Sequence, residues 1–397
     1  MRRRRWLHWG CAQCAALAAS GPGAAFAQGS EAPGAGAPAA GSDWTMPARF
    51  TRPSVNSDEG GLWAMMDREE TRLRRSPFTM RDETLTGYLT GIACHLGGEH
   101  CPDIRVYPIR TPYFNASMAP NGMMQIWSGL LLRVENEAQL AAVVAHEIGH
   151  YLQRHTLERL RDAKSKSAAA TFMAMFGVVG LVGQMAMIAS ALSFSRDQER
   201  DADRISIVLM RGAGYDPQEA PKVWANLLAE LTAAGKDATQ ESVLFATHPP
   251  SEERRATLAA MTAGSSGETR ETTYREKLAP WRHGLLEDEI KRGRPDESIV
   301  LLTRLLQPEP ADADVLYFRA AARRLRGKDG DQADAMADLL AACQTGREPA
   351  AAHRAMAEMH KAQGQLEPAR AAWQRYLDKA PDAPDAPMVR QTLEEMK

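Results

Sequence analysis

The sequence predicts a mainly α-helical protein of the α+β class, with a small β-sheet in its first half and paired helices in its second. Residues 137–152 place apolar side chains at helical spacing, separated by good helix formers. Beyond about residue 280, alanine-rich amphipathic segments recur with a period of about 34 residues. Residues Asn115 to Ala119 are expected to form an edge strand of the sheet.

The helix predicted over residues 137–152 contains His146-Glu147-Ile148-Gly149-His150. Positions i and i+4 share one helix face, so His146 and His150 can present two imidazole nitrogens to one zinc ion. Glu147 lies one step round the helix, where its carboxylate can act as general base on a metal-bound water. The alternative is a core helix with two hydrogen-bonded histidines, and a third ligand would decide between the two.

Glu199 is the candidate third ligand, in a charged segment about fifty residues downstream. A catalytic zinc site needs three protein ligands and one open position. A third histidine six residues after His150 is excluded, because Thr156 stands there, and His155 is expected to point away from the metal face. Asp203, one turn after Glu199, can accept the second N–H of a ligand histidine. The alternative is a solvated, charged helix face.

Further motifs lie between and after these residues: Asn115–Gly122, Ser128–Leu131, Arg154-His155, and Thr247-His248-Pro249 followed by Arg254. With His-Glu-x-x-His and Glu-x-x-Ala-Asp at 199–203, they resemble the zinc metallopeptidase family of HtpX and the CAAX prenyl proteases, in its periplasmic, BepA-like branch. The resemblance covers about residues 80–258 and continues into C-terminal tetratricopeptide repeats.

This resemblance implies a gluzincin-like catalytic domain with one zinc ion per chain, held by His146, His150 and Glu199. Glu147 would be the catalytic base, and Asp203 would support the site. His248 would lie near the zinc, either as a latent ligand in the water position or as a stabiliser of the oxyanion. The residues leave these two roles open.

The first 27 residues have the pattern of a cleaved signal peptide. Arg2 to Arg5 precede a stretch of small and apolar residues that ends in Ala25-Phe26-Ala27. A short membrane anchor is the weaker alternative, because Gln13 and Pro22 interrupt a run that is too short. The general secretory route is the default, and the consecutive arginines leave the twin-arginine route open. We therefore expect a periplasmic protein.

The expected organisation is a signal peptide over 1–27, a Pro-, Gly- and Ala-rich linker over 28–50, a peptidase domain over 51–265 and a repeat domain over 266–397. Removal of the signal peptide changes the net charge from −2 to about −6. An acidic mature protein of this kind gives no reason to expect nucleic-acid binding.

The mature sequence would keep three cysteines, Cys94, Cys101 and Cys343. In an oxidising compartment, Cys94 and Cys101 can form a disulfide across the intervening glycines. A second metal site with the adjacent His95 and His100, or unpaired thiols, are the alternatives. Cys343 is expected to pack as a small apolar residue.

Residues 168–194 form a long, nearly uncharged run with the length of a transmembrane helix. The run lies between the two ligand-bearing helices, so a single crossing would separate Glu199 from His146 by a bilayer. A helical hairpin that packs on the catalytic domain, or makes peripheral contact with a lipid surface, avoids this. Membrane embedding is the alternative.

In residues 350–381, Ala357, Ala369, Trp373 and Pro381 fall on tetratricopeptide positions, and weaker copies precede them. An ordinary helical bundle is the alternative. Stacked helix pairs would offer a concave surface for an extended peptide or a partner.

Two function classes compete. The first is a zinc endopeptidase that degrades misfolded or stalled envelope proteins, with the repeats as a docking module. The second is a chaperone or assembly factor for outer-membrane proteins, with a largely latent protease site. The intact Glu147 favours the first. The resemblance implies both, with unfolded or misassembled envelope proteins and the outer-membrane β-barrel assembly machinery as partners.

Overall fold

The computed structural model of the protein describes residues 44–165, 194–235, 248 and 252–396. These described residues belong to one compact unit. The predicted signal peptide, most of the predicted linker and nearly all of the hairpin expected at 168–194 lie outside the described residues. Within the described ranges, no helix has both the length and the apolar character needed to cross a membrane.

The described sheet has three strands, β1 (Arg105–Ile109), β2 (Ala116–Met118) and β3 (Met123–Trp127), in the order β1-β3-β2. β1 runs parallel to β3, whereas β2 runs antiparallel to it. Gly122, with φ 87°, forms the turn between β2 and β3, where a Cβ atom would lie 2.0 Å from the backbone oxygen of Asp103. The predicted edge strand is confirmed, because β2 lies at one edge of this sheet.

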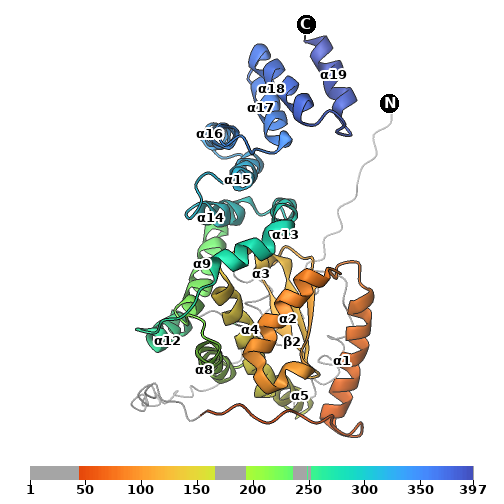
Figure 1. The fold of residues 1–397 in the computed structure, drawn as a ribbon, viewed down its shortest axis with the longest axis vertical. Helices are drawn as coiled ribbons and strands as arrows, with labels where there is room; N and C mark the ends of the chain where they lie inside the picture. Colours follow the sequence, from red (N-terminus) through yellow and green to blue (C-terminus); the bar gives the residue numbers. More distant parts are fainter. Residues whose placement is uncertain (1–43, 166–193, 236–247, 249–251, 397) are drawn as a thin grey trace, which may run out of the picture. The chain divides into compact units, whose positions relative to one another are not determined.

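Helix α4 (Glu137–Leu152) is the centre of this half of the molecule (Figure 1), and all of its residues are buried. The Asn136 side chain accepts a hydrogen bond from the Gln139 N–H and so caps its first turn. α4 packs most extensively against β2 and against the helices α2 (Glu83–Gly97), α8 (Arg196–Gly212) and α9 (Glu219–Ala234). The remaining elements of this half are α1 (Asp58–Arg75), η1 (Gly98–Asp103), α3 (Ser128–Arg133), α5 (His155–Ser165) and α12 (Glu252–Thr262).

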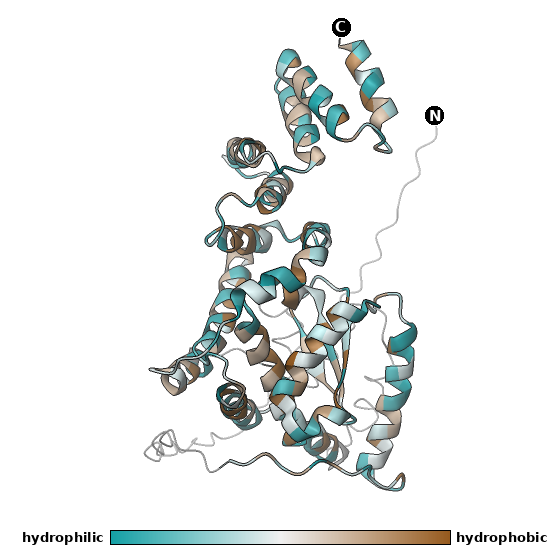
Figure 2. Ribbon diagram, in the orientation of Figure 1, coloured by the Kyte–Doolittle hydropathy of each residue, from teal (hydrophilic) through white to brown (hydrophobic). Residues whose placement is uncertain are grey.

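The C-terminal residues form helices that pack in sequential pairs, α14 with α15, α15 with α16 and α17 with α18 (Figure 1). Figure 2 shows that these helices are amphipathic, with apolar and polar residues alternating along each ribbon. The small residues Ala335, Ala357 and Ala369 are fully buried, as the repeat pattern requires. The elements are α13 (Glu271–Lys291), α14 (Pro295–Leu305), α15 (Ala313–Arg326), α16 (Asp331–Gln344), α17 (Ala350–Ala362), α18 (Leu366–Lys379) and α19 (Ala386–Glu395). The predicted fold class, mainly α with a small sheet followed by a helical array, is confirmed.

The expected domain boundary at 265/266 falls between α12 and α13, and the packing continues across it. Arg133 of α3 is buried and pairs with Glu230 of α9 at 2.7 Å and with Glu289 of α13 at 2.9 Å. Arg304 of α14 contacts the second oxygen of Glu230 at 2.8 Å. Removing one partner of such a buried network leaves an unpaired charge, so these ion pairs hold α13 and α14 against α3 and α9.

Cys94 and Cys101 form a disulfide, as the sequence predicted, and it joins α2 to η1. Cys343, expected to pack as a small buried apolar residue, is half-buried near the end of α16. It packs against the buried cluster of the C-terminal helices, and its sulfur lies 3.9 Å from His353 Nδ1.

Candidate metal centre

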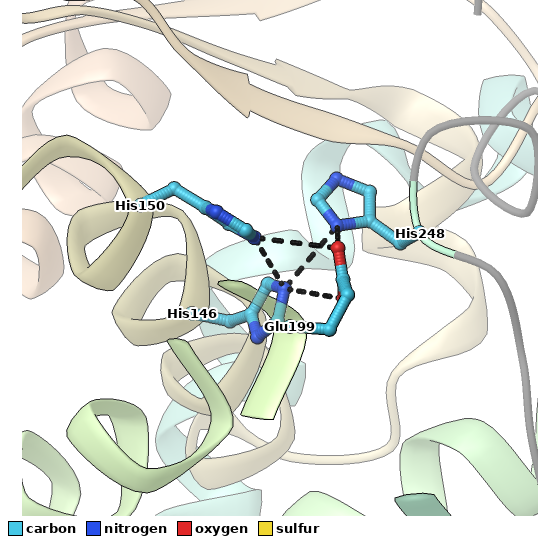
Figure 3. A group of neighbouring side chains, drawn as sticks. All are labelled: His146, His150, Glu199 and His248. Carbon is cyan, nitrogen blue, oxygen red and sulfur yellow. Dashed lines mark hydrogen bonds and ion pairs between the residues drawn. The ribbon is translucent and has the colours of Figure 1, made fainter. Parts of the chain in front are cut away.

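Two helices and one loop residue bring four side chains to a common point (Figure 3). His146 and His150 extend from α4, Glu199 extends from the first turn of α8, and His248 approaches from the opposite side. All four residues are buried, and one ligand atom from each lies within 4.8 Å of the others. The residues predicted as zinc ligands are therefore neighbours in space, and His248 is the fourth member of the cluster.

The separations between these atoms fit a tetrahedral zinc site. His146 Nε2 lies 3.1 Å from His150 Nε2 and 3.3 Å from His248 Nδ1. The Glu199 oxygens lie 3.5 Å from each of the two α4 imidazole nitrogens. Ligand atoms about 2.1 Å from one tetrahedral zinc are themselves roughly 3.4 Å apart. The donor set, three imidazoles and one carboxylate, also has the chemistry that zinc prefers.

Asp203 lies against the first candidate ligand. His146 Nδ1 lies 3.0 Å from Asp203 Oδ1, a contact that favours a proton on Nδ1, while Nε2 faces the cluster. Arg254 donates two hydrogen bonds of 2.8 Å to the same carboxylate and also contacts Glu199 at 2.6 Å. The Arg254 guanidinium lies 4.6 Å from the ring centre of Trp224 on α9. Asp203 and Arg254 therefore form a second layer of contacts that holds the candidate ligands in place.

His155 has a place in the site that helical spacing did not predict. As expected, it is not one of the four clustered residues, but its Nδ1 lies 2.9 Å from His150 Nδ1, the ring nitrogen that faces away from the cluster. Helical spacing did not predict this contact because α4 ends at Leu152, and Arg154, with φ 55°, has a left-handed conformation before α5 begins. His155 is thus a hydrogen-bond partner of a candidate ligand. The Phe194 ring, also missed, stacks on His150 with centroids 3.9 Å apart.

Gly149 explains how α8 comes close enough to α4 to place Glu199. A Cβ atom on Gly149 would lie 3.1 Å from both the Cα and the carbonyl oxygen of Ala202. The backbone of α8 therefore rests on a position without a side chain, one residue before His150. The Ser195–Gln198 capping box begins α8 and sets Glu199 in its first turn.

Glu147 lies beside the cluster and outside it. Its carboxylate accepts a hydrogen bond from the Met118 backbone N–H at the end of β2. His248 Nε2 lies 3.5 Å from Glu147 Oε1, while its Nδ1 lies 2.9 Å from Glu199 Oε1. In this conformation the His248 ring thus lies between the ligand cluster and Glu147.

The charges of the site favour a cation. Burial alone would raise the pKa of Glu199, but the His248 charge and hydrogen bonds from the three histidines hold it far below its ordinary value. Burial opposes the charge of His146, yet Asp203 and Glu199 outweigh burial and raise its pKa to about 9. Burial lowers the pKa of His150 and raises that of Glu147. The buried carboxylates of Glu199 and Asp203 therefore attract positive charge, which a divalent cation can supply.

Residues 81–262 match peptidase family M48. The Arabidopsis thaliana mitochondrial metalloendopeptidase OMA1 is 32% identical over 167 residues, which are 42% of this chain and 33% of that protein. The beta-barrel assembly-enhancing protease of Escherichia coli K12 is 30% identical over 229 residues, 53% of this chain and 46% of that protein. The protein of the same name from Yersinia pestis is 27% identical over 227 residues, 51% and 46% of the two chains. The alignments therefore span less than half the length of each of these relatives.

Proposed function

Because residues 81–262 match peptidase family M48, we propose that the protein is a zinc-dependent endopeptidase of the bacterial periplasm that acts on misfolded or stalled envelope proteins. The observation that carries the proposal is the position of Glu147. It is a buried carboxylate beside four convergent ligand atoms, one of them from Glu199. Two helices that served only as core would gain nothing from burying a carboxylate each at the same place, since each carboxylate carries a desolvation penalty.

In this proposal His146, His150 and Glu199 hold the zinc ion, which supplies Lewis acidity by lowering the pKa of water and polarising a peptide carbonyl. Glu147 takes the proton of the attacking water and delivers it to the leaving amine. Burial raises the pKa of Glu147 towards the working range of a general base. Asp203 acts through His146, so it is a positioning residue.

The substrate would bind in extended form along β2. β2 is an edge strand, and its Met118 N–H is hydrogen-bonded to the Glu147 carboxylate. A peptide paired with this strand would run beside the general base, and main-chain pairing tolerates varied side chains. This arrangement suits a protease with many unfolded clients.

His248 would hold the resting enzyme latent. Its Nδ1 joins the candidate ligands and its Nε2 faces Glu147, so the ring occupies the region where the attacking water must lie. Withdrawal of His248 would open this position. The competing role, stabilisation of the oxyanion, would require His248 to move away from Glu199 as the substrate enters.

The helical array would dock substrates or partners as a tetratricopeptide-type module. A groove of about 510 Å³ is lined by residues of four of its helices, including Ile290, Ala321, Leu325, Met359 and Ala362. The relatives named beta-barrel assembly-enhancing protease support outer-membrane proteins and their assembly machinery as partners. The N-terminal sequence pattern supports export to the periplasm.

The second candidate is a chaperone or assembly factor for outer-membrane proteins, in which the protease site is seldom active. The position of His248 within the ligand cluster favours the chaperone function, because a peptidase site whose water position is filled by a histidine would cleave little. Both candidate functions would use the same groove of the helical array. They differ in whether the activity of the protein requires Glu147.

Cleavage of casein, measured together with zinc content, tests the proposal. Glu147→Gln keeps the shape of the side chain and removes the base, so zinc should remain while cleavage falls roughly 10²- to 10⁴-fold. Near wild-type cleavage by Glu147→Gln would overturn the mechanism. If wild type does not cleave casein, and if both proteins equally prevent aggregation of an unfolded outer-membrane protein, the chaperone reading is correct.

A further inference from the structure

A second group of metal-ligating side chains lies at the junction of α16 and α17. Cys343 lies near the end of α16, Glu348 lies in the connecting loop and His353 lies in the first turns of α17. One ligand atom from each falls within 4.8 Å of the other two. Cys343 Sγ is 3.9 Å from His353 Nδ1, and His353 Nε2 is 2.8 Å from Glu348 Oε1.

Glu348 holds the imidazole of His353 within this group. Because Glu348 Oε1 accepts from Nε2, that nitrogen carries a proton in the metal-free protein, and a cation bound by both groups would replace this proton. His353 and Glu348 are both more than nine-tenths buried, and Cys343 is half-buried.

One buried atom of the group has unused bonding capacity. Glu348 Oε1 contacts both His353 and Lys379, but Glu348 Oε2 is buried without a hydrogen-bond partner from another residue in the described part of the chain. A buried carboxylate oxygen left in this state costs free energy. A cation beside Cys343 and His353 would remove that cost.

We propose that Cys343, Glu348 and His353 form a second binding site for a borderline-soft divalent cation of the zinc type, which links α16 to α17. Thiolate, imidazole and carboxylate are all established zinc ligands, and a thiolate selects against calcium and magnesium. Water would complete the coordination, since the chain supplies three groups. The site stands apart from the peptidase centre and does not depend on the function proposed for that centre.

A nucleophilic thiol is the other chemistry that a Cys–His–Glu arrangement can support, and the surroundings of Cys343 disfavour it. Burial and the charge of Glu348 raise the pKa of the thiol, whereas an activated cysteine needs a lowered pKa. Metal binding overcomes this by replacing the proton, which leaves for solvent as the sulfur becomes a ligand.

Lys379 opposes binding of a cation and provides a matched variant. Its ammonium lies 2.9 Å from Glu348 Oε1, and its side chain is 38% exposed, so it can return to water when a cation enters. Lys379→Gln removes the competing charge and should tighten metal binding. Cys343→Ser changes the decisive ligand with little change of volume and should abolish thiolate coordination.

Titration of cobalt(II) into the metal-depleted, full-length protein without thiol reductant tests the proposal. A cobalt-bound thiolate gives an intense near-ultraviolet charge-transfer band, and the three histidines and the carboxylate of the peptidase centre cannot produce it. We expect the band in wild type, its loss in Cys343→Ser, and an affinity at least about tenfold weaker in His353→Asn. Lys379→Gln should bind cobalt more tightly than wild type.

Circular dichroism of each variant shows whether its fold is retained. The proposal is overturned if folded wild type shows no thiolate band in large excess of cobalt, or if the band persists in Cys343→Ser. It is also overturned if His353→Asn, shown to be folded, binds cobalt with wild-type affinity. The double change His146→Ala plus His150→Ala should leave the band intact, since this site shares no residue with the peptidase centre.

Discussion

His146 Nδ1 lies 3.0 Å from Asp203 Oδ1, and this contact joins the helix that carries Glu147 to the helix that carries Glu199. The same carboxylate accepts two hydrogen bonds from Arg254, so its position is fixed from two sides. His146 can then present only Nε2 to the ligand cluster. The metal affinity of the site should depend on Asp203 although Asp203 is not itself a ligand.

Asp203→Asn should weaken zinc binding by 10- to 100-fold, because the amide keeps the shape and loses the charge that holds His146 and Arg254. Competition with a chelator measures this affinity. Asp201→Asn is the matched control, since its side chain is 51% exposed on the same helix. Equal zinc affinity in wild type and Asp203→Asn would contradict the assigned role.

The peptidase centre should hold one zinc ion per chain. Metal analysis of purified wild type and of His146→Ala plus His150→Ala should differ by one equivalent, because the double variant keeps only Glu199 and His248 of the cluster. Equal zinc contents in the two proteins would show that the ion is bound elsewhere.

Gly149→Ala should weaken both the fold and the zinc site. The added methyl group would lie 3.1 Å from the backbone of Ala202, so α8 must move, at a cost of about 1–3 kcal/mol. Urea denaturation measures the change in unfolding free energy, and chelator competition measures the loss of zinc affinity. Gly91→Ala is the control of opposite sign, since nothing lies within 4 Å of its Cβ position in α2 and alanine favours a helix. An unchanged unfolding free energy in Gly149→Ala would mean that α8 can shift to accommodate the methyl group without loss of packing.

Helical periodicity predicted most of the ligand cluster because its ligands lie within two regular helices. His146 and His150 share a face of α4, and Glu199 and Asp203 are one turn apart on α8. Local spacing says nothing of how the two helices meet. The close approach at Gly149 is a tertiary contact, and it becomes visible only when Ala202 is placed against α4.

Sequence reasoning missed a contact made at a break between two helices, and it missed charged residues that are buried within helices. His155 was judged as though α4 continued, but Arg154 adopts a left-handed conformation that periodicity cannot anticipate. The buried pairs of Arg133 with Glu230 and Glu289 were also missed, since a charged residue in a sequence is ordinarily read as exposed.

Glu70 should give the protein a pH-dependent stability that is unrelated to metal. Burial alone would raise its pKa, but Arg105, Tyr107 and Arg74 outweigh burial and lower the pKa from 4.5 to about 2. A carboxyl with a lower pKa in the folded state stabilises the fold above its unfolded pKa, and loses this effect as pH falls towards the folded value. Wild type should therefore be more stable than Glu70→Gln at neutral pH, by at most about 3 kcal/mol.

The difference between wild type and Glu70→Gln should close as pH falls from about 4.5 to about 2. Denaturation of both proteins at several pH values measures it, and loss of zinc in acid affects the two alike. Glu69→Gln is the neighbouring control, because burial raises the pKa of Glu69 and its charge therefore contributes no such stabilisation. A difference independent of pH would show that Glu70 acts through packing alone.

The last prediction concerns His248, whose two ring nitrogens face Glu199 and Glu147. If the ring closes the site as a fourth ligand, wild type should cleave casein slowly. His248→Ala should then cleave it faster, because water gains access to the position between the ligands and Glu147. If His248 instead stabilises the oxyanion, the same substitution should slow cleavage by roughly 10²-fold or more.

The two roles of His248 thus predict opposite signs in one assay. We expect activation, since the 2.9 Å contact of Nδ1 with Glu199 places the ring among the ligands before any substrate is bound. His283→Ala is the control, because His283 is more than half exposed and lies on α13. Glu147→Gln combined with His248→Ala should be inactive, which ties the gained activity to this centre. Unchanged cleavage in His248→Ala would reject both roles and leave His248 with a structural one.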